Sequence, residues 1–81
     1  MHYVYVLHSP SFDKIYIGET HDYVARLEAH NHPSSKGWTK SFQPWIMIHM
    51  EILQSKSAAL IRERQLKSYR GREWIKDTYL R

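Results

Sequence analysis

Residues 3–7 read YVYVL, and this short run limits the possible folds more than any other part of the chain. Successive side chains alternate between the two faces of a β-strand, so a strand with this sequence is apolar or aromatic on both faces. Such a pattern is typical of a strand that has a neighbour on each side. The run therefore predicts the central strand of a sheet.

A second strand is predicted after a short turn. Residues 14–18, KIYIG, alternate isoleucine on one face with lysine and tyrosine on the other, and the strand is expected to break at Gly18. The connecting residues 8–13, HSPSFD, have turn chemistry and are few enough to predict an antiparallel hairpin. Tyr5 and Tyr16 are therefore expected on adjacent strands.

A capped helix is predicted after the second strand. Thr20 or Asp22 can serve as its N-cap, and the helix is expected to run to about His30. Arg26 and His30 are four residues apart, so both side chains lie on one face of this helix. The apolar stripe of the helix is expected to consist of Tyr23, Val24 and Leu27.

An exposed loop and a third strand are predicted next. Residues 31–44, NHPSSKGWTKSFQP, contain prolines, a glycine and serines, which favour a loop. Residues 45–53, WIMIHMEIL, are rich in strand-forming residues and predict the third strand. Simple alternation places His49 and Glu51 on the same face of this strand as Trp45.

Two more helices complete the predicted fold. Ser55 or Ser57 caps the first, which is expected to run through about Tyr69 and to end at Gly71 as its C-terminal glycine. A short tail helix is expected over residues 72–80, with its apolar side chains packed against the rest of the protein.

The predicted order of elements is β-β-α-β-α-α. It describes an α/β protein of the α+β kind, in which a three-stranded antiparallel sheet is flanked by helices. A chain of 81 residues builds only one small core, so residues 1–81 are expected to form a single domain. Cysteine is absent, and we find neither a signal-peptide pattern nor the roughly 20 apolar residues of a membrane span. We therefore expect a cytoplasmic protein without a membrane partner.

The net charge of +4 is unevenly distributed. Residues 54–81 contain eight Lys and Arg against three Asp and Glu, whereas residues 1–53 contain four against five. A positive C-terminal third favours a polyanionic partner such as a nucleic acid. Many small basic proteins bind no polyanion, so charge alone leaves both interpretations open.

One carboxylate lies where an apolar side chain is expected. In the second helix, Glu63 projects into the middle of a stripe formed by Ala59, Leu60 and Leu66. A charge on a core-facing stripe needs compensation. Lys67, four residues later, can pair with Glu63, and this interpretation is favoured when the helix is considered alone. The alternative is that Glu63 faces a cavity and binds a cation.

Four segments in this order and spacing resemble the GIY-YIG endonuclease family. They are YVYVL at 3–7, KIYIG at 14–18, ARLEAHN at 25–31 and RERQLK at 62–67. The tripeptide YIG alone is a weak signal, but its combination with the other segments is strong. For small stand-alone bacterial members the similarity extends through Gly71.

The resemblance implies a catalytic set of Tyr5, Tyr16, Arg26, His30 and Glu63. Glu63 would bind one Mg²⁺ or Mn²⁺ ion, a hard cation that prefers oxygen ligands, and the ion would stabilise the leaving 3′ oxygen. Arg26 would stabilise the charge of the scissile phosphate. Tyr5 would deprotonate or orient the attacking water, with Lys14 and Arg26 as the cations that assist it. Tyr16 would hydrogen-bond the phosphate or the water, and His30 would accept a proton or contact a phosphate oxygen.

The sequence departs from the family pattern in three respects. The first motif reads Tyr3-Val4-Tyr5, in which only the last residue carries chemistry. Many family members have an asparagine downstream of the glutamate, whereas the only asparagine here is Asn31. Larger relatives also carry a separate DNA-reading domain, and its absence here predicts weak sequence specificity.

Basic and aromatic residues outside the catalytic set are candidates for nucleic-acid binding. In the loop, two lysines flank a tryptophan, a combination that suits a phosphate backbone and a stacked base. The tryptophan can equally pack on the core, and the helix arginines can be a solvated surface. The candidates are Lys14, Lys36, Trp38, Lys40, Arg62, Lys67 and Arg70.

The leading hypothesis is a metal-dependent DNA endonuclease that leaves a 5′ phosphate and a 3′ hydroxyl, as the resemblance implies. Its substrate is expected to be single-stranded or branched DNA, with RNA left open. The alternative is a nucleic-acid-binding module of the same fold with little or no activity.

Overall fold

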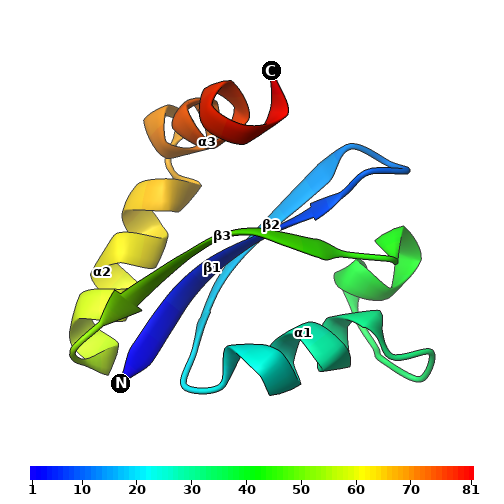
Figure 1. Ribbon diagram of the computed structural model, residues 1–81, viewed down its shortest axis with the longest axis horizontal. Coiled ribbons are helices and arrows are strands. Elements are labelled where there is room, and N and C mark those ends of the chain that lie inside the picture. Colours follow the sequence, from blue (N-terminus) through cyan, green and yellow to red (C-terminus); the bar gives the residue numbers. More distant parts are fainter.

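The computed structural model describes residues 1–81. Its sheet has the strand order β2-β1-β3, formed by β1 (His2–Ser9), β2 (Lys14–Thr20) and β3 (Ile46–Leu53). The central strand β1 pairs antiparallel with both neighbours. The predictions of a central strand at 3–7 and of a three-stranded antiparallel sheet are confirmed (Figure 1).

Helices cover both faces of the sheet. The α-helices are α1 (Tyr23–Asn31), α2 (Lys56–Lys67) and α3 (Tyr69–Ile75), and two shorter helical segments are η1 (Trp38–Phe42) and η2 (Lys76–Leu80). α2 and α3 lie on one side of the strands and α1 lies on the other (Figure 1). No helix has the length and apolar composition to span a membrane.

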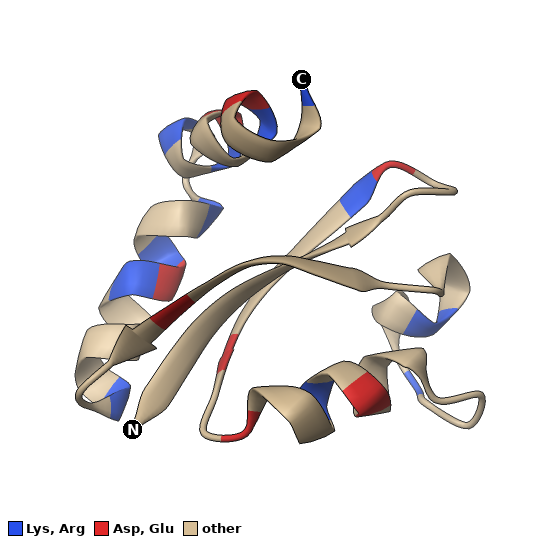
Figure 2. Cartoon of the chain, viewed as in Figure 1, with Lys and Arg blue, Asp and Glu red and all other residues tan.

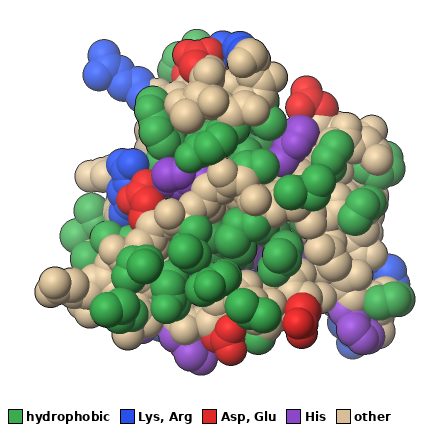
Figure 3. Space-filling view, in the orientation of Figure 1, with side chains coloured by type: hydrophobic (Ala, Val, Ile, Leu, Met, Phe, Trp, Pro, Cys, Tyr) green, Lys and Arg blue, Asp and Glu red, His purple; other side chains and the backbone are tan.

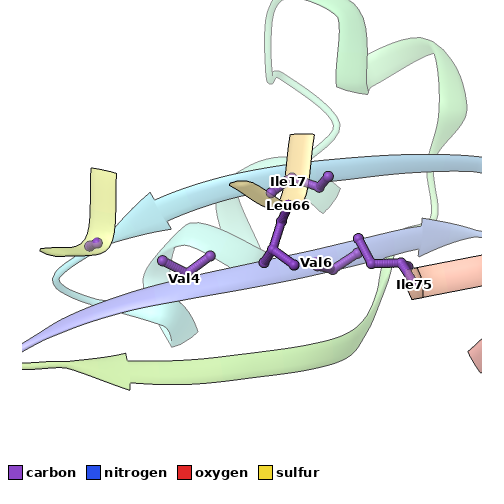
Figure 4. Close-up of a cluster of buried hydrophobic side chains, with 6 residues drawn as sticks. Val4, Val6, Ile17, Leu66 and Ile75 are labelled. Carbon is purple, nitrogen blue, oxygen red and sulfur yellow. The ribbon is translucent and has the colours of Figure 1, made fainter. Parts of the chain in front are cut away.

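The first face of the sheet packs against α2 and α3. Fully burying an aliphatic side chain contributes about 1.5–3 kcal/mol to the free energy of unfolding. The buried apolar side chains on this face therefore provide most of its apolar stabilisation. Leu60, which the sequence pattern placed on the packing stripe, is 44% exposed, so that prediction is wrong. The buried cluster consists of Val4, Val6, Ile17, Ala59, Leu66 and Ile75 (Figure 4).

The second face packs against α1 and η1. Its buried residues are Tyr5, Leu7 and Trp45, and Leu27 of α1 packs against them. Asp22 is the N-cap of α1, where its side chain accepts a hydrogen bond from the Ala25 backbone N–H. Val24 is 54% exposed, contrary to the prediction, because α1 contacts the sheet through the turn positions 23, 27 and 30.

A β-bulge in β3 changes which residues face α2 and α3. Leu7 pairs with Met47 but Val6 pairs with His49, so Ile48 is an extra residue in the ladder. The extra residue reverses the alternation. His49 and Glu51 therefore lie on the face opposite Trp45 and Met47, and their predicted common face is wrong.

The outer strand β3 carries exposed apolar side chains. Ile46 and Ile52 are 52% and 58% exposed. Figure 3 shows the molecule from the side on which β3 lies in front of the other strands. Hydrophobic side chains gather across the middle of this face.

α2 and α3 are separated by a cap rather than by a glycine. Ser55 caps α2, which ends at Lys67, and Ser68 caps α3 by accepting a hydrogen bond from the Gly71 backbone N–H. Gly71 therefore lies inside α3, and its predicted role as a C-terminal glycine is wrong. A Cβ atom at this position would lie 2.5 Å from the Leu66 Cα, so glycine is required for the close approach of the two helices.

Candidate active site

Tyr5 and Tyr16 project from adjacent strands over the same face of the sheet. Tyr5 pairs with Gly18 and Leu7 pairs with Tyr16, and the two tyrosine ring centroids are 6.2 Å apart. β2 continues through Gly18 to Thr20, so the predicted break at Gly18 is wrong. A Cβ atom at Gly18 would lie 2.6 Å from the Tyr5 hydroxyl oxygen. Glycine is therefore needed because the Tyr5 side chain lies across β2 at this point.

His30 links Tyr5, on the sheet face that packs against α1, to Thr39 in η1. It is the last-turn residue of α1, and its Nε2 lies 3.0 Å from the Tyr5 hydroxyl. Its Nδ1 lies 3.1 Å from Thr39 Oγ1 in η1, and both His30 and Thr39 are buried. The imidazole is thus held between a phenol and an alcohol, which fixes its orientation.

Arg26 lies one turn before His30 on α1. Its guanidinium is exposed to solvent, and hydrogen bonding with Tyr5, followed by Tyr16, raises the pKa of Arg26 above its ordinary value. Arg26 remains a cation at any physiological pH. The two tyrosine hydroxyls and a permanent positive charge therefore share one small region.

The pKa of Tyr5 is raised to about 12, mainly because the phenol is buried. Arg26 pulls this pKa down, while the charges of Tyr16 and Glu63 push it up. Lys14, which was expected to assist Tyr5, instead lies 5.7 Å from the centroid of the Phe42 ring. Tyr5 is therefore a neutral phenol at neutral pH, and on its own it is a poor base.

The hydrogen bonds of His30 admit an arrangement in which Tyr5 is the donor. Arg26 has only donors, so it can approach the Tyr5 oxygen only as a donor, which leaves the Tyr5 proton free to be donated. Nε2 of His30 lies 3.0 Å from the Tyr5 oxygen. Burial and the charge of Arg26 lower the pKa of His30, which favours the neutral imidazole, and in the tautomer with its proton on Nδ1 the ring donates to Thr39 Oγ1. In that tautomer Tyr5 is hydrogen-bonded to an acceptor that can take its proton.

Glu63 approaches this region from α2. Its side chain is 17% exposed, and Lys67 Nζ lies 2.7 Å from its Oε1, so the pairing that the helix pattern favoured is present. Oε2 has no protein hydrogen bond. The carboxylate is close enough to Tyr5 for its charge to raise the pKa of that phenol. Pairing with Lys67 and proximity to Tyr5 therefore occur together.

The donor set fits one hard divalent cation. Mg²⁺ is usually bound by one or two carboxylates together with waters and substrate phosphates, rather than by a cage of protein ligands. Glu63 offers a carboxylate oxygen without a protein hydrogen bond, and its charge reaches Tyr5. Lys67 is 46% exposed, so its ammonium group can leave the carboxylate at little cost. Glu63 is the residue that would bind such an ion.

Two open grooves meet at Tyr16 and Trp38. The first, which we call the α1 groove, has a volume of about 720 Å³ and is lined by Arg26, His30 and Lys36. The second, which we call the basic groove, has a volume of about 700 Å³ and is lined by the five cations Lys14, Lys67, Arg72, Lys76 and Arg81. Tyr16 and Trp38 line both grooves.

The candidate nucleic-acid-binding residues are divided by the fold. Trp38 is 52% exposed and packs on Phe42 and Trp45 with centroid distances of 4.8 and 5.8 Å, so it is partly packed and partly available to a ligand. Arg62 donates to both oxygens of Glu51, away from the tyrosines. Lys40 and Arg70 line neither groove.

Thr39 and Gly18 were missed as site residues by sequence reasoning. Thr39 is in a stretch that reads as a loop, and no local pattern marks it as the partner of His30. Gly18 is part of the KIYIG motif, and its importance could have been inferred from the register of a hairpin that pairs it with Tyr5. Asn31 is not in the site: its side chain bonds the backbone of Trp45 in both directions, at 2.9 and 2.6 Å.

A known family of catalytic domains matches most of this chain. The model of the GIY-YIG catalytic domain matches residues 1–76 of this chain. The chain belongs to the GIY-YIG family. This GIY-YIG protein therefore belongs to a family of nucleases, which implies a nucleic-acid substrate, and GIY-YIG nucleases generally use divalent metal ions.

Several curated proteins named UPF0213 are similar to this GIY-YIG protein. One from Haloquadratum walsbyi is 37% identical over 68 residues, which cover 84% of this chain and 75% of the relative. One from Staphylococcus haemolyticus is 31% identical over 75 residues, covering 93% and 90%. One from Staphylococcus aureus is 35% identical over 68 residues, covering 84% and 82%. No solved structure matches the chain.

Proposed function

We propose that this GIY-YIG protein is an endonuclease that hydrolyses DNA phosphodiester bonds with the help of one Mg²⁺ or Mn²⁺ ion. We further propose that its sequence specificity is weak and that it acts on single-stranded or branched DNA as a single domain. The observation that carries the proposal is the surroundings of the Tyr5 hydroxyl. It is hydrogen-bonded to a neutral imidazole, lies beside the Arg26 guanidinium, and is close enough to Glu63 to sense its charge.

In the proposed reaction Tyr5 and His30 act together on the attacking water. A phenol with a pKa of about 12 cannot take a proton from water unless it releases its own. The Tyr5 O–H donates to His30 Nε2, so the water proton passes to the Tyr5 oxygen as the Tyr5 proton passes to His30. The product of this transfer is an imidazolium that stays hydrogen-bonded to Thr39. General base catalysis of this kind contributes about 10²–10⁴-fold.

Arg26, Tyr16 and Glu63 supply the remaining requirements. The planar guanidinium of Arg26 is exposed beside both tyrosines, where it can donate to two phosphoryl oxygens. Tyr16 lines both grooves, which supports its proposed role in hydrogen-bonding the phosphate or the water. A divalent ion on Glu63 would supply stabilisation of the charge that develops on the leaving 3′ oxygen.

The test is cleavage of labelled oligonucleotides in the presence of Mg²⁺ or Mn²⁺. Single-stranded, duplex, flapped and RNA substrates are compared, each with and without EDTA. We expect metal-dependent cleavage of DNA by the wild type and a loss of at least about 100-fold in Glu63→Gln and Tyr5→Phe. Preferred cleavage of RNA would replace DNA as the proposed substrate.

Matched variants separate chemistry from packing. Tyr3→Phe removes a phenol oxygen from the same strand and face, where the Tyr3 ring packs on Tyr23. Glu19→Gln removes a carboxylate that is 19% exposed, close to the 17% of Glu63. Both controls are expected to cleave at nearly the wild-type rate. Cleavage that is equal in wild type and Glu63→Gln would refute the proposal, and binding without cleavage by the wild type would favour a binding module.

A further inference from the structure

The basic groove lies between the β1–β2 hairpin and the C-terminal helices. Lys14 begins β2, Lys67 ends α2, and Arg72, Lys76 and Arg81 come from the segment after α2. Figure 1 shows α3 and the C-terminal end beside the hairpin, and Figure 2 shows Lys and Arg positions on both elements. The C-terminal segment, which has no role in the proposed chemistry, therefore forms one wall of a groove that opens at Tyr16.

The charges of the groove suit a chain of phosphates. Asp13 is its one acidic lining residue against five cations. Lys67, Lys76 and Arg81 have carboxylate partners, but these three cations are 45–54% exposed and such pairs contribute little, so a phosphate can replace the carboxylate. Lys14 and Arg72 contact no carboxylate, and Arg72 is oriented by the bond from its Nε to the Lys67 carbonyl oxygen at 3.0 Å. These two residues carry the uncompensated charge.

Together with the proposed catalytic roles, the position of the groove implies a strand direction. In an in-line displacement the attacking and leaving oxygens lie on opposite sides of the phosphorus. The water is activated on the Tyr5–His30 side, and His30 lines the α1 groove. Glu63 is bound to Lys67, which lines the basic groove. The proposed role of Glu63 requires the leaving 3′ oxygen to lie on the Glu63 side, which is the side of the basic groove, and this oxygen belongs to the nucleotide on the 5′ side of the break.

We propose that the basic groove binds the backbone phosphates of the substrate strand on the 5′ side of the cleaved bond, while the 3′ side enters the α1 groove. The proposal rests on the proposed function, because the direction follows from cleavage that leaves a 3′ hydroxyl. It assigns Lys14 and Arg72 as phosphate-binding residues and gives the C-terminal helices a role in substrate binding.

The test first measures binding in EDTA, where cleavage is blocked. The double variant Lys14→Gln/Arg72→Gln is compared with Arg64→Gln/Arg70→Gln, which removes the same charge from exposed positions outside both grooves. Each lost phosphate contact reduces the slope of log Kd against log salt by roughly 0.7–0.9, so the groove variant is expected to lose about 1.5. Its affinity is expected to fall about tenfold, and that of the control less than twofold. Thermal unfolding of both variants checks that the fold is unchanged.

The direction is tested after the cut position has been mapped with the wild type. Oligonucleotides carry neutral methylphosphonate groups either on the 5′ side or on the 3′ side of the cut. We expect the 5′ substitutions to weaken wild-type binding and to have little further effect on the groove variant, because both changes remove the same contacts. The direction would be overturned if the 5′ substitutions weakened binding of the groove variant as much as that of the wild type. It would also be overturned if the 3′ substitutions, rather than the 5′ ones, lost their effect in the groove variant.

The outcomes also separate this proposal from the proposed function. Equal salt slopes for the groove and control variants would overturn the proposal that the basic groove binds phosphates, even if the wild type cleaves DNA. A wild type that binds through the groove without cleaving would retain the groove, and would refute both the nuclease proposal and the strand direction derived from it.

Discussion

Gly18→Ala tests the geometry on which the candidate site depends. Replacing a strand glycine by alanine ordinarily stabilises a protein by roughly 0.5–1 kcal/mol, because glycine loses the most conformational freedom on folding. Here the new Cβ would lie 2.6 Å from the Tyr5 hydroxyl oxygen and 2.8 Å from its Cζ. Ordinary contact begins at 3.4 Å, so the Tyr5 ring has to move by about 0.8 Å. Tyr5 is 1% exposed and has little room to move.

The steric cost is expected to exceed the entropic gain. Overpacking a well-packed core costs about 1–3 kcal/mol, so the net loss in unfolding free energy is about 1–2 kcal/mol. For a domain of this size that loss lowers the Tm by roughly 5–15 °C. A displacement of about 1 Å at a reacting group lowers turnover about 100-fold, and here it also disrupts the 3.0 Å hydrogen bond to His30. Urea unfolding, monitored by tryptophan fluorescence, measures the loss of stability. The oligonucleotide assay measures the loss of turnover.

A double-mutant comparison shows whether the clash is the cause. Tyr5→Phe removes the hydroxyl oxygen, which is the closest atom to the added Cβ. In the Tyr5→Phe background, Gly18→Ala is therefore expected to cost at least about 0.5 kcal/mol less than in the wild type. A Gly18→Ala protein with wild-type stability and wild-type cleavage would refute the reasoning, because it would show that Tyr5 does not occupy the space above Gly18.

Two further predictions concern His30 and Asn31. Burial and the charge of Arg26 lower the pKa of His30 from 6.5, so below about pH 6.5 the unfolded chain takes up a proton that the native protein does not. The unfolding free energy is therefore expected to fall as pH drops below about 6.5, and His30→Gln is expected to flatten this part of the profile in urea titrations. If the two profiles have the same slope, His30 is not the group responsible. Asn31→Ala removes both hydrogen bonds to the backbone of Trp45, a residue that is 2% exposed. It is expected to lower the unfolding free energy by about 2 kcal/mol. The control is Asn31→Asp, which retains the acceptor. An unchanged unfolding midpoint for Asn31→Ala would show that the two hydrogen bonds between Asn31 and the Trp45 backbone do not stabilise the protein.

Local patterns were sufficient to predict most elements of the fold. The central position of residues 3–7 follows from a run that is apolar on both faces. Each helix cap could be narrowed to two residues, of which Asp22 and Ser55 are the caps, because a short polar side chain satisfies a nearby backbone N–H without help from distant residues. The proximity of Tyr5 to Tyr16 follows from the short hairpin that pairs β1 with β2.

Other features depend on contacts between segments that are distant in sequence. The bulge at Ile48 reverses the faces of His49 and Glu51, and it is defined by pairing with β1 rather than by the sequence of β3. Gly71 looks like a helix terminator, but its missing side chain serves the approach of α3 to Leu66.

The chemistry of the site is divided in the same way. The sequence by itself determined which reactive groups are present and, through strand alternation and helical spacing, which of them lie on a common face. The tertiary structure alone decided that burial raises the pKa of Tyr5 to about 12, and that Thr39 holds the imidazole whose other nitrogen faces Tyr5. The physical reason is that protonation depends on burial and on neighbouring charges, and both come from segments brought together only when the chain folds.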